Sequence, residues 1–203
     1  MRVGLMGGTF NPIHIGHLRM AQEAMDAHGL DKVWLIPNGR PPHREVLDTS
    51  PEDRHMMTLL ASLEHSGLRV SRVEIDDPTQ PYSFQTVERI KRQFPNLELF
   101  FLTGADAVLN YVWKNFDQLL GNVQGFIVCS RPGFNWDKLQ EKLAGEKLAH
   151  LDRIKFLEIT MIEVSSTDIR ARVRAGKSLR FLVPRAVEEY IQRQRLYLPR
   201  ADS

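Results

Sequence analysis

The sequence predicts an α/β protein in which a Rossmann-like, doubly wound parallel sheet carries helices on both faces. Short apolar runs alternate along the chain with segments whose apolar residues recur at helical spacing. Glycine- and proline-containing turns separate the two kinds of segment. Strands that alternate with helices form crossover units, and such units build a parallel sheet that is covered on both faces.

The first three elements are a strand, a helix and a second strand. Residues 3–6 form an apolar run that stops at two glycines, which is typical of a buried strand before a tight turn. Apolar residues at positions 18, 21 and 25 recur at helical spacing, and Gly29 follows the end of this helix. The run 33–36, which a proline terminates, predicts the second strand.

The next segment begins with a loop over residues 37–44, because three prolines and a glycine occur there. Ser50 as the N-cap and Pro51 in the first turn start a helix that extends to Leu63. Strand spacing then returns at Val70, Val73 and Ile75. Residues 76–81 are expected to form a loop and residues 86–94 a helix.

The second half of the chain contains the most apolar strand candidate, residues 97–103, with Leu-Phe-Phe-Leu at its centre. One helical pattern follows, with apolar residues at 108, 109 and 112 and later at 119 and 120. The remaining predicted elements are a strand at 125–130, a helix at 136–148, a strand-like segment at 154–162, and helices at 166–175 and 185–195.

Length and composition restrict the class of protein. The 203 residues are expected to form a single domain over 1–203, since no repeat or linker divides them. A net charge of +2, from 27 basic and 25 acidic residues, argues against a nucleic-acid partner. The single cysteine, Cys129, excludes an intramolecular disulfide and is expected to be buried. No apolar stretch reaches the length of a membrane span, so we expect a cytoplasmic protein without a membrane partner; a homo-oligomer stays open.

The loop after the first predicted strand is the clearest candidate for a functional site. Gly7 and Gly8 allow backbone N–H groups to approach a phosphate closely, and Thr9 can add a hydroxyl donor. His14 and His17, three residues apart, place two imidazoles on one side of the first helical turn. Because a helix N-terminus already attracts anions, this segment predicts a phosphate-binding site.

Other interpretations of this loop fit the sequence less well. There is no G-x-x-x-x-G-K-[ST] sequence, so the loop is not a P-loop. No G-x-G-x-x-G follows the strand either, which weakens the interpretation of the chain as a dinucleotide dehydrogenase. A zinc site lacks a nearby third ligand at familiar spacing, so no protein-bound metal is predicted. Two histidines three residues apart also occur on ordinary protein surfaces.

A second candidate site begins near Ser165. Ser165 and Asp168 fit a capping box in which Asp replaces the usual Glu or Gln, and this is also an ordinary way to begin a helix. A hydroxyl-rich helix start with Arg170 one turn further on is, in addition, a favourable anion site. The C-terminal helices, residues 166–195, are therefore expected to carry a second phosphate-binding element.

The segment His14-Ile15-Gly16-His17 resembles the His-x-Gly-His element that the nucleotidyltransferase superfamily shares with class I aminoacyl-tRNA synthetases. Residues 164–170 resemble that superfamily's C-terminal Ile-Ser-x-Thr-x-Ile-Arg element, with Val164 in place of the first Ile. The resemblance implies that His14, His17 and Arg170 are catalytic and that Mg²⁺ is bound mainly through the phosphates of ATP. The ATP-binding residues that it implies are Gly7, Gly8, Thr9, Phe10, His17, Gly104, Asp106, Arg131, Ser165, Ser166, Thr167 and Arg170.

The middle of the chain resembles one family within that superfamily, the bacterial nicotinate mononucleotide adenylyltransferases. The segments that carry the resemblance are residues 37–44, 81–86, 104–106 and 130–134 together with Trp113. They imply transfer of the adenylyl group of ATP to nicotinate mononucleotide, which gives nicotinate adenine dinucleotide and pyrophosphate in NAD biosynthesis. The substrate-binding residues that they imply are His43, Arg44, Tyr82, Ser83 and Trp113.

These residue types suit the implied substrates. An aromatic face such as that of Trp113 can stack on a cationic pyridine ring, although a core tryptophan is the alternative. Ser83 would place a hydroxyl near the nicotinate carboxylate, and His43 and Arg44 offer donors for a mononucleotide phosphate. Asp106 can accept from a ribose hydroxyl or simply cap a helix.

Three features depart from the family pattern and leave other activities open. Asn11 replaces the common Asp of the glycine loop, Pro81-Tyr82-Ser83 replaces the usual Ser-Tyr-Thr, and the loop between Asp106 and Trp113 is slightly shorter than in many relatives. A sister adenylyltransferase that acts on nicotinamide mononucleotide is therefore one alternative. A non-catalytic nucleotide- or RNA-binding module is another, although no basic face with interleaved aromatic residues is visible.

Overall fold

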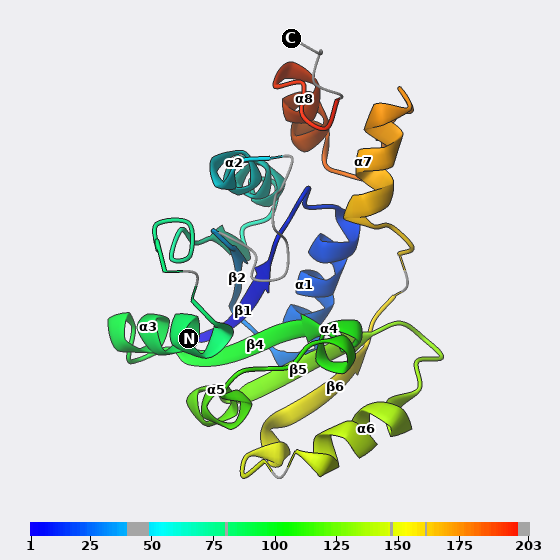
Figure 1. The fold of residues 1–203 in the computed structure, drawn as a ribbon. Coiled ribbons are helices and arrows are strands. Elements are labelled where there is room, and N and C mark those ends of the chain that lie inside the picture. Colours follow the sequence, from blue (N-terminus) through cyan, green and yellow to red (C-terminus); the bar gives the residue numbers. More distant parts are fainter. Residues whose placement is uncertain (40–48, 80, 147, 161, 199–203) are drawn as a thin grey trace. The chain divides into compact units, whose positions relative to one another are not determined.

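Six parallel strands form one sheet in the order β3-β2-β1-β4-β5-β6 in the computed structural model, which describes residues 1–39, 49–79, 81–146, 148–160 and 162–198 (Figure 1). The strands are β1 (Arg2–Gly8), β2 (Lys32–Pro37), β3 (Leu68–Val70), β4 (Glu98–Gly104), β5 (Gly125–Ser130) and β6 (Ile154–Glu158). In register, Val3 of β1 lies opposite Leu99 of β4, and Phe101 of β4 lies opposite Phe126 of β5.

Both faces of the sheet are covered at its centre. Successive residues of a strand point to opposite faces, and every residue of β5 is buried, as are the four central residues of β4. This burial explains why these two strands are continuous apolar runs in the sequence. The predicted Rossmann-like α/β fold is confirmed.

The helices follow local signals in the sequence. They are α1 (Ile15–His28), α2 (Pro51–Ser62), α3 (Ser83–Gln93), α4 (Ala105–Asn110), α5 (Phe116–Asn122), α6 (Trp136–Gly145), α7 (Ser166–Arg174) and α8 (Arg185–Arg193). Ser50 caps α2, since its Oγ accepts from the backbone N of Asp53 at 3.0 Å. Gly29 follows α1 with a φ of 56°, in the left-handed region that glycine tolerates best.

Four predicted elements differ from the structure. Val73 and Ile75 lie in turns, because β3 ends at Val70. The helical pattern at 108–120 is two helices, α4 and α5, and Val112 between them is 92% exposed. The strand-like segment at 154–162 ends at Glu158, and α6 ends at Gly145 rather than at position 148.

The described chain divides into two compact units. Unit 1 comprises Met1–Gly7, Arg19–Trp34 and Pro81–Met161, and within it α3 lies beside α5. Unit 2 comprises Gly8–Leu18, Leu35–Gln80 and Ile162–Ser203, and within it α2 lies beside α8. A single functional domain over residues 1–203 stays a prediction. None of the described helices is long and apolar enough to span a membrane.

Candidate active site

The loop after β1, Gly8–His14, lies in unit 2 and is closely packed. Phe10 is buried with a φ of 46°, and its ring meets the ring of His17 edge to face, with 5.2 Å between the ring centroids. A Cβ on Gly8 would lie 2.9 Å from Cζ of Phe10, which explains why a glycine occupies this position. The glycine thus allows the Phe10 ring to fold back under the loop and support His17.

The two predicted histidines lie side by side at the start of α1. Their ring centroids are 3.7 Å apart and the planes are inclined by 31°. The backbone N of His14 donates to Nδ1 of His17 at 3.2 Å, and the backbone N of His17 donates back to the carbonyl of His14 at 3.0 Å. His14 is buried, whereas His17 keeps an exposed part.

Burial keeps both imidazoles neutral. Desolvation lowers the pKa of His14 to about 4, and desolvation together with the charge of His14 lowers the pKa of His17 well below its ordinary value. Because Nδ1 of His17 accepts a hydrogen bond, the proton of its neutral ring resides on Nε2. His17 therefore offers an Nε2–H donor that is fixed in tautomer and orientation.

Gly16, between the histidines, lies against both neighbouring segments. A Cβ at this position would lie 3.1 Å from Nδ1 of His14 and 3.2 Å from Cγ1 of Val164. Within the described residues, Nδ1 of His14 has no hydrogen-bond partner although it is buried. A side chain at position 16 would therefore crowd both segments, and the buried Nδ1 of His14 can still accept or donate one hydrogen bond.

The start of α7 joins the loop through two backbone carbonyls. Ser166 Oγ donates to the carbonyl of Pro12 at 2.9 Å, and Arg170 Nη1 donates to the carbonyl of Asn11 at 2.8 Å. Arg170 Nη2 also donates to Thr167 Oγ1 at 3.2 Å. Unit 2 therefore brings together the two helix starts that the sequence predicts as phosphate-binding elements.

The predicted capping box of α7 is half formed. Ser165 Oγ accepts from the backbone N of Asp168 at 3.1 Å, which confirms the N-cap. The Asp168 carboxylate pairs with Nε of Arg172 at 2.8 Å. An aspartate is one methylene shorter than the glutamate of the usual motif. Its carboxylate pairs instead with the arginine four residues further along the helix, which offers a charged partner.

Asn11 is the acceptor of a buried network that sequence reasoning did not find. Its Oδ1 accepts from Thr49 Oγ1 at 2.5 Å and from the Tyr197 hydroxyl at 2.8 Å. Burial raises the pKa of Tyr197, so this hydroxyl stays a donor. No local pattern signals the network, because its members are separated by 38 and 186 positions in the sequence.

The residues predicted for the pyridine belong to unit 1. Trp113 packs among Phe101, Phe116 and Phe126, and its Nε1 donates to the carbonyl of Ala107 at 3.2 Å. The tryptophan is thus packed against aromatic rings of the core while part of it stays exposed. Because its N–H already has a hydrogen-bond acceptor, the exposed part of the ring can interact with a ligand by stacking.

Two further predicted residues of unit 1 begin α3. Tyr82 is its N-cap and Ser83 its first residue, and the Lys114 ammonium lies 4.6 Å above the Tyr82 ring. Gln85 Oε1 accepts from the backbone N of Tyr82 at 2.9 Å, which fixes this helix start.

The other predicted nucleotide contacts of unit 1 follow β4 and β5. Gly104 is the N-cap of α4, so Asp106 lies in the first turn of that helix and does not cap it. Arg131 directly follows the last residue of β5 and is exposed. His43 and Arg44 lie outside the described residues.

Metal ligands do not cluster in the described ranges. No group of three or more His, Cys, Asp or Glu side chains is arranged there to hold a metal ion. Cys129, as predicted, is buried in β5, and desolvation raises the pKa of its thiol to about 12. The candidate site is therefore made of imidazole, hydroxyl, guanidinium and backbone N–H donors, a set that suits phosphate oxygens.

The chain is similar to known proteins along its whole length. Residues 5–172 match the family described as Cytidylyltransferase-like. A probable nicotinate-nucleotide adenylyltransferase of Moorella thermoacetica is 44% identical over 204 residues, which cover 99% of this chain and 94% of that protein. A protein of the same description from Rubrobacter xylanophilus is 41% identical over 206 residues, which cover 100% of this chain and 94% of the relative.

Solved structures share the fold. The Plasmodium falciparum nicotinic acid mononucleotide adenylyltransferase complexed with NaAD superposes with a TM-score of 0.75 at 16% identity, over 97% of each chain. A putative nicotinate-nucleotide adenylyltransferase from Vibrio parahaemolyticus gives a TM-score of 0.61 at 17% identity, over 94% of this chain and 98% of that one.

Proposed function

Because the chain belongs to the nicotinate-nucleotide adenylyltransferases, we propose that it transfers the adenylyl group of ATP to nicotinate mononucleotide. The products are nicotinate adenine dinucleotide and pyrophosphate. The observation that supports this most directly is the neutral pair His14 and His17, whose rings lie side by side. Asn11 and Pro12 join this pair to the serine- and arginine-bearing start of α7.

The reaction needs no nucleophile from the protein. An oxygen of the 5′-phosphate of nicotinate mononucleotide attacks the α-phosphorus of ATP in line. A new P–O bond forms while the bond to the bridging oxygen breaks, and pyrophosphate leaves with the electron pair. Catalysis of such a step consists of positioning the reactants and stabilising charge.

The donors of unit 2 supply that stabilisation. His17 Nε2–H donates to an oxygen of the reacting phosphate, and the backbone N–H groups of the glycine loop share the triphosphate charge. Ser166, Thr167 and Arg170 contact the leaving pyrophosphate. The hydrogen bond between Arg170 and the Asn11 carbonyl keeps this guanidinium beside the loop before ATP arrives. Its geometry therefore needs little reorganisation in the transition state.

Magnesium enters this scheme with the nucleotide. A magnesium ion that is held mainly by ATP phosphates needs few protein ligands, and the described residues hold no group of three or more His, Cys, Asp or Glu side chains arranged for a metal. In this proposal Mg²⁺ would arrive with ATP and offset the negative charge of its phosphates. The role of the protein is to orient the complex of ATP and Mg²⁺.

The residues proposed to recognise nicotinate mononucleotide are those that the sequence resemblance implies. In this proposal Trp113 stacks on the pyridine ring, and Tyr82 and Ser83 lie by the nicotinate carboxylate. The start of α3 suits an anion, because its first backbone N–H groups carry the positive end of the helix dipole. His43 and Arg44 contact the mononucleotide phosphate. A cytoplasmic location and a homo-oligomeric state remain predictions.

The deciding experiment measures pyrophosphate release from ATP with nicotinate mononucleotide and with nicotinamide mononucleotide in parallel. We expect release with the acid at a kcat/KM at least tenfold above that with the amide. Comparable rates with both would identify a dual-specificity enzyme. Release with the amide alone would assign the sister activity, and no release with either would leave a nucleotide-binding module.

A further inference from the structure

Arg54, in the first turn of α2, is fully buried and bonded to two separate loops of unit 2. Its Nη1 donates to the carbonyl of Thr9 at 2.9 Å and to the carbonyl of Asn38 at 2.6 Å. Its Nη2 donates to the carbonyl of Gly39 at 2.7 Å, and Nη1 also reaches Asn38 Oδ1 at 3.1 Å. One guanidinium thus joins the loop after β1 to the end of β2.

The described residues around Arg54 offer oxygen dipoles but no counter-ion. Across the described part of the chain, no carboxylate lies within ion-pair distance of Arg54, and its Nε has no hydrogen-bond partner. Desolvation lowers the pKa of the guanidinium accordingly. A buried charge that is hydrogen-bonded but has no carboxylate beside it is costly, and the positive end of the α2 dipole adds to that cost. Among the described residues, ion pairing therefore gives no reason for an arginine here.

The geometry of the planar fork gives a better reason. Three carbonyls from two chain segments converge on it, and an ammonium at the end of a lysine cannot match that spacing. The segments meet directly as well, since the backbone N of Asn38 donates to the carbonyl of Gly8 at 3.0 Å. Gly39 is confined on its other side, because a Cβ there would overlap the carbonyl oxygen of Glu74.

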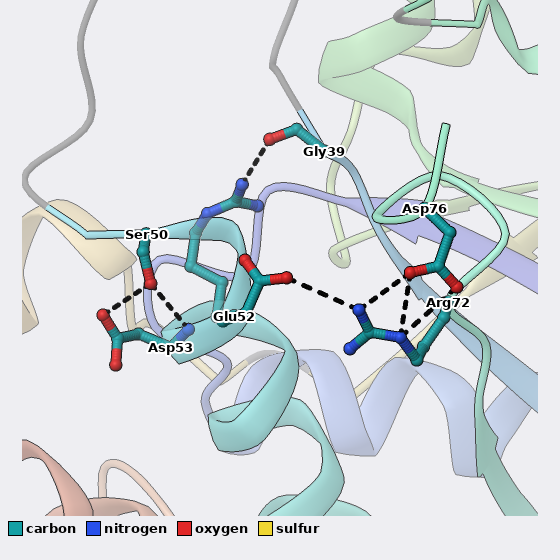
Figure 2. Close-up of polar contacts among 7 residues, drawn as sticks. Gly39, Ser50, Glu52, Asp53, Arg72 and Asp76 are labelled. Carbon is teal, nitrogen blue, oxygen red and sulfur yellow. Dashed lines mark hydrogen bonds and ion pairs between the residues drawn. The ribbon is translucent and has the colours of Figure 1, made fainter. Parts of the chain in front are cut away.

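The start of α2 fixes Arg54 itself. Ser50 Oγ accepts from the backbone N of Asp53 at 3.0 Å and donates to the Asp53 carboxylate at 2.7 Å (Figure 2). The backbone N of Arg54 donates to the carbonyl of Ser50 at 3.2 Å. Figure 2 also shows a second arginine, Arg72, whose partners Glu52 and Asp76 are exposed. Among the described residues, the hydrogen bonds of the Arg72 guanidinium go to these two carboxylates.

We propose that Arg54 is a positioning residue for adenylyl transfer, which sets the glycine loop at Thr9 and the exit of β2 at Asn38–Gly39 in one fixed arrangement. The inference rests on the proposed function for its kinetic part. Arg54 touches no substrate, because it is fully buried. It acts through the two loops whose backbone it bonds.

The test compares Arg54→Lys and Arg54→Met with the wild type, and uses Arg72→Met as the matched control. For each protein, kcat and KM for ATP and nicotinate mononucleotide are measured per folded molecule, with the folded fraction taken from circular dichroism. We expect Arg54→Lys to lower kcat by about 10- to 100-fold, by analogy with the loss of residues that orient the ligands of a metal site. Arg72→Met should stay within twofold of the wild type.

A second measurement reports on the loops without the reaction. Hydrogen–deuterium exchange of Arg54→Lys should increase in peptides that cover residues 5–18 and 35–39, and Arg72→Met should leave both unchanged. Dissociation constants for ATP alone are recorded on the same samples. If the wild type binds ATP but transfers nothing, the proposed function fails. The exchange rates and ATP affinities of the Arg54 variants would then still show whether Arg54 positions the two loops.

Two results would overturn the inference. One is a kcat per folded molecule of Arg54→Lys and Arg54→Met within twofold of the wild type. The other is a loss of activity that the folded fraction accounts for completely, with exchange that rises evenly over the chain. Either result would reduce Arg54 to a residue that stabilises the fold.

Discussion

At the scale of single residues, the depressed pKa of His14 links protonation to stability. The folded-state pKa of about 4 lies below the ordinary value of 6.5, so the folded protein binds fewer protons than the unfolded chain between these pH values. Stability is therefore unaffected by His14 above pH 6.5 and falls as the pH drops toward 4. By pH 5 the loss is on the order of 2 kcal/mol.

This pH dependence can be measured by urea unfolding of the wild type and of His14→Gln at pH 7 and pH 5. Glutamine keeps a similar volume and does not titrate. We expect the free energy of unfolding of the variant to change less between the two pH values than that of the wild type. Equal changes in both proteins would contradict the buried, neutral state of His14.

The residues of the candidate site differ in how far the sequence reveals them. His14, His17 and Ser165 are signalled locally, by a spacing of three residues or by a cap at a helix start. Thr49 and Arg54 carry no such signal, because their partners lie in other segments. A buried hydrogen bond between distant segments depends on the tertiary fold and leaves no periodicity in the sequence.

At the scale of elements, the N-cap of α7 gives a prediction with a built-in control. Ser165→Ala removes the oxygen that accepts from the backbone N of Asp168 and should lower the free energy of unfolding by about 1 kcal/mol. Ser165→Asp restores a capping oxygen and should recover most of that loss. Chemical denaturation measures both. An alanine variant as stable as the wild type would show that solvent replaces the cap.

The end of α4 depends on a lysine from another helix. Lys142 Nζ donates to the carbonyls of Val108 at 2.7 Å and Leu109 at 2.9 Å, which are free acceptors at a helix C-terminus. We expect Lys142→Met to destabilise the protein by about 1–2 kcal/mol and to change the fluorescence of the nearby Trp113. Lys138→Met, on the exposed face of α6, is the control. An unchanged stability in Lys142→Met would contradict this role.

The same helix end explains why the periodicity of apolar residues predicted one helical pattern between 105 and 122, where the structure has two helices. Apolar residues at helical spacing continue through Val112, yet the chain turns extended at Tyr111 and Val112 is exposed. The break lets Trp113 reach the aromatic cluster of the core. Strands β4 and β5, by contrast, were predictable because burial on both faces demands an unbroken apolar run.

At the scale of the whole molecule, Tyr197 links the C-terminal segment to the glycine loop through Asn11. Tyr197→Phe leaves Asn11 Oδ1 with one donor fewer in a buried position, which costs about 1–2 kcal/mol. Because the Asn11 carbonyl accepts from Arg170 and the next carbonyl, that of Pro12, accepts from Ser166, we expect kcat to fall as well. Tyr190→Phe, which loses a half-buried bond to Asp53, is the control and should change stability alone. Equal kcat values in both variants would contradict the link.

The central claim is that the imidazole of His17 stabilises the transition state of adenylyl transfer. Steady-state kinetics of His17→Ala with ATP and nicotinate mononucleotide test it most directly. We predict a kcat lowered by at least about 100-fold, as for the loss of one donor to a developing charge, with KM values for both substrates changed far less. A turnover close to that of the wild type would contradict the claim.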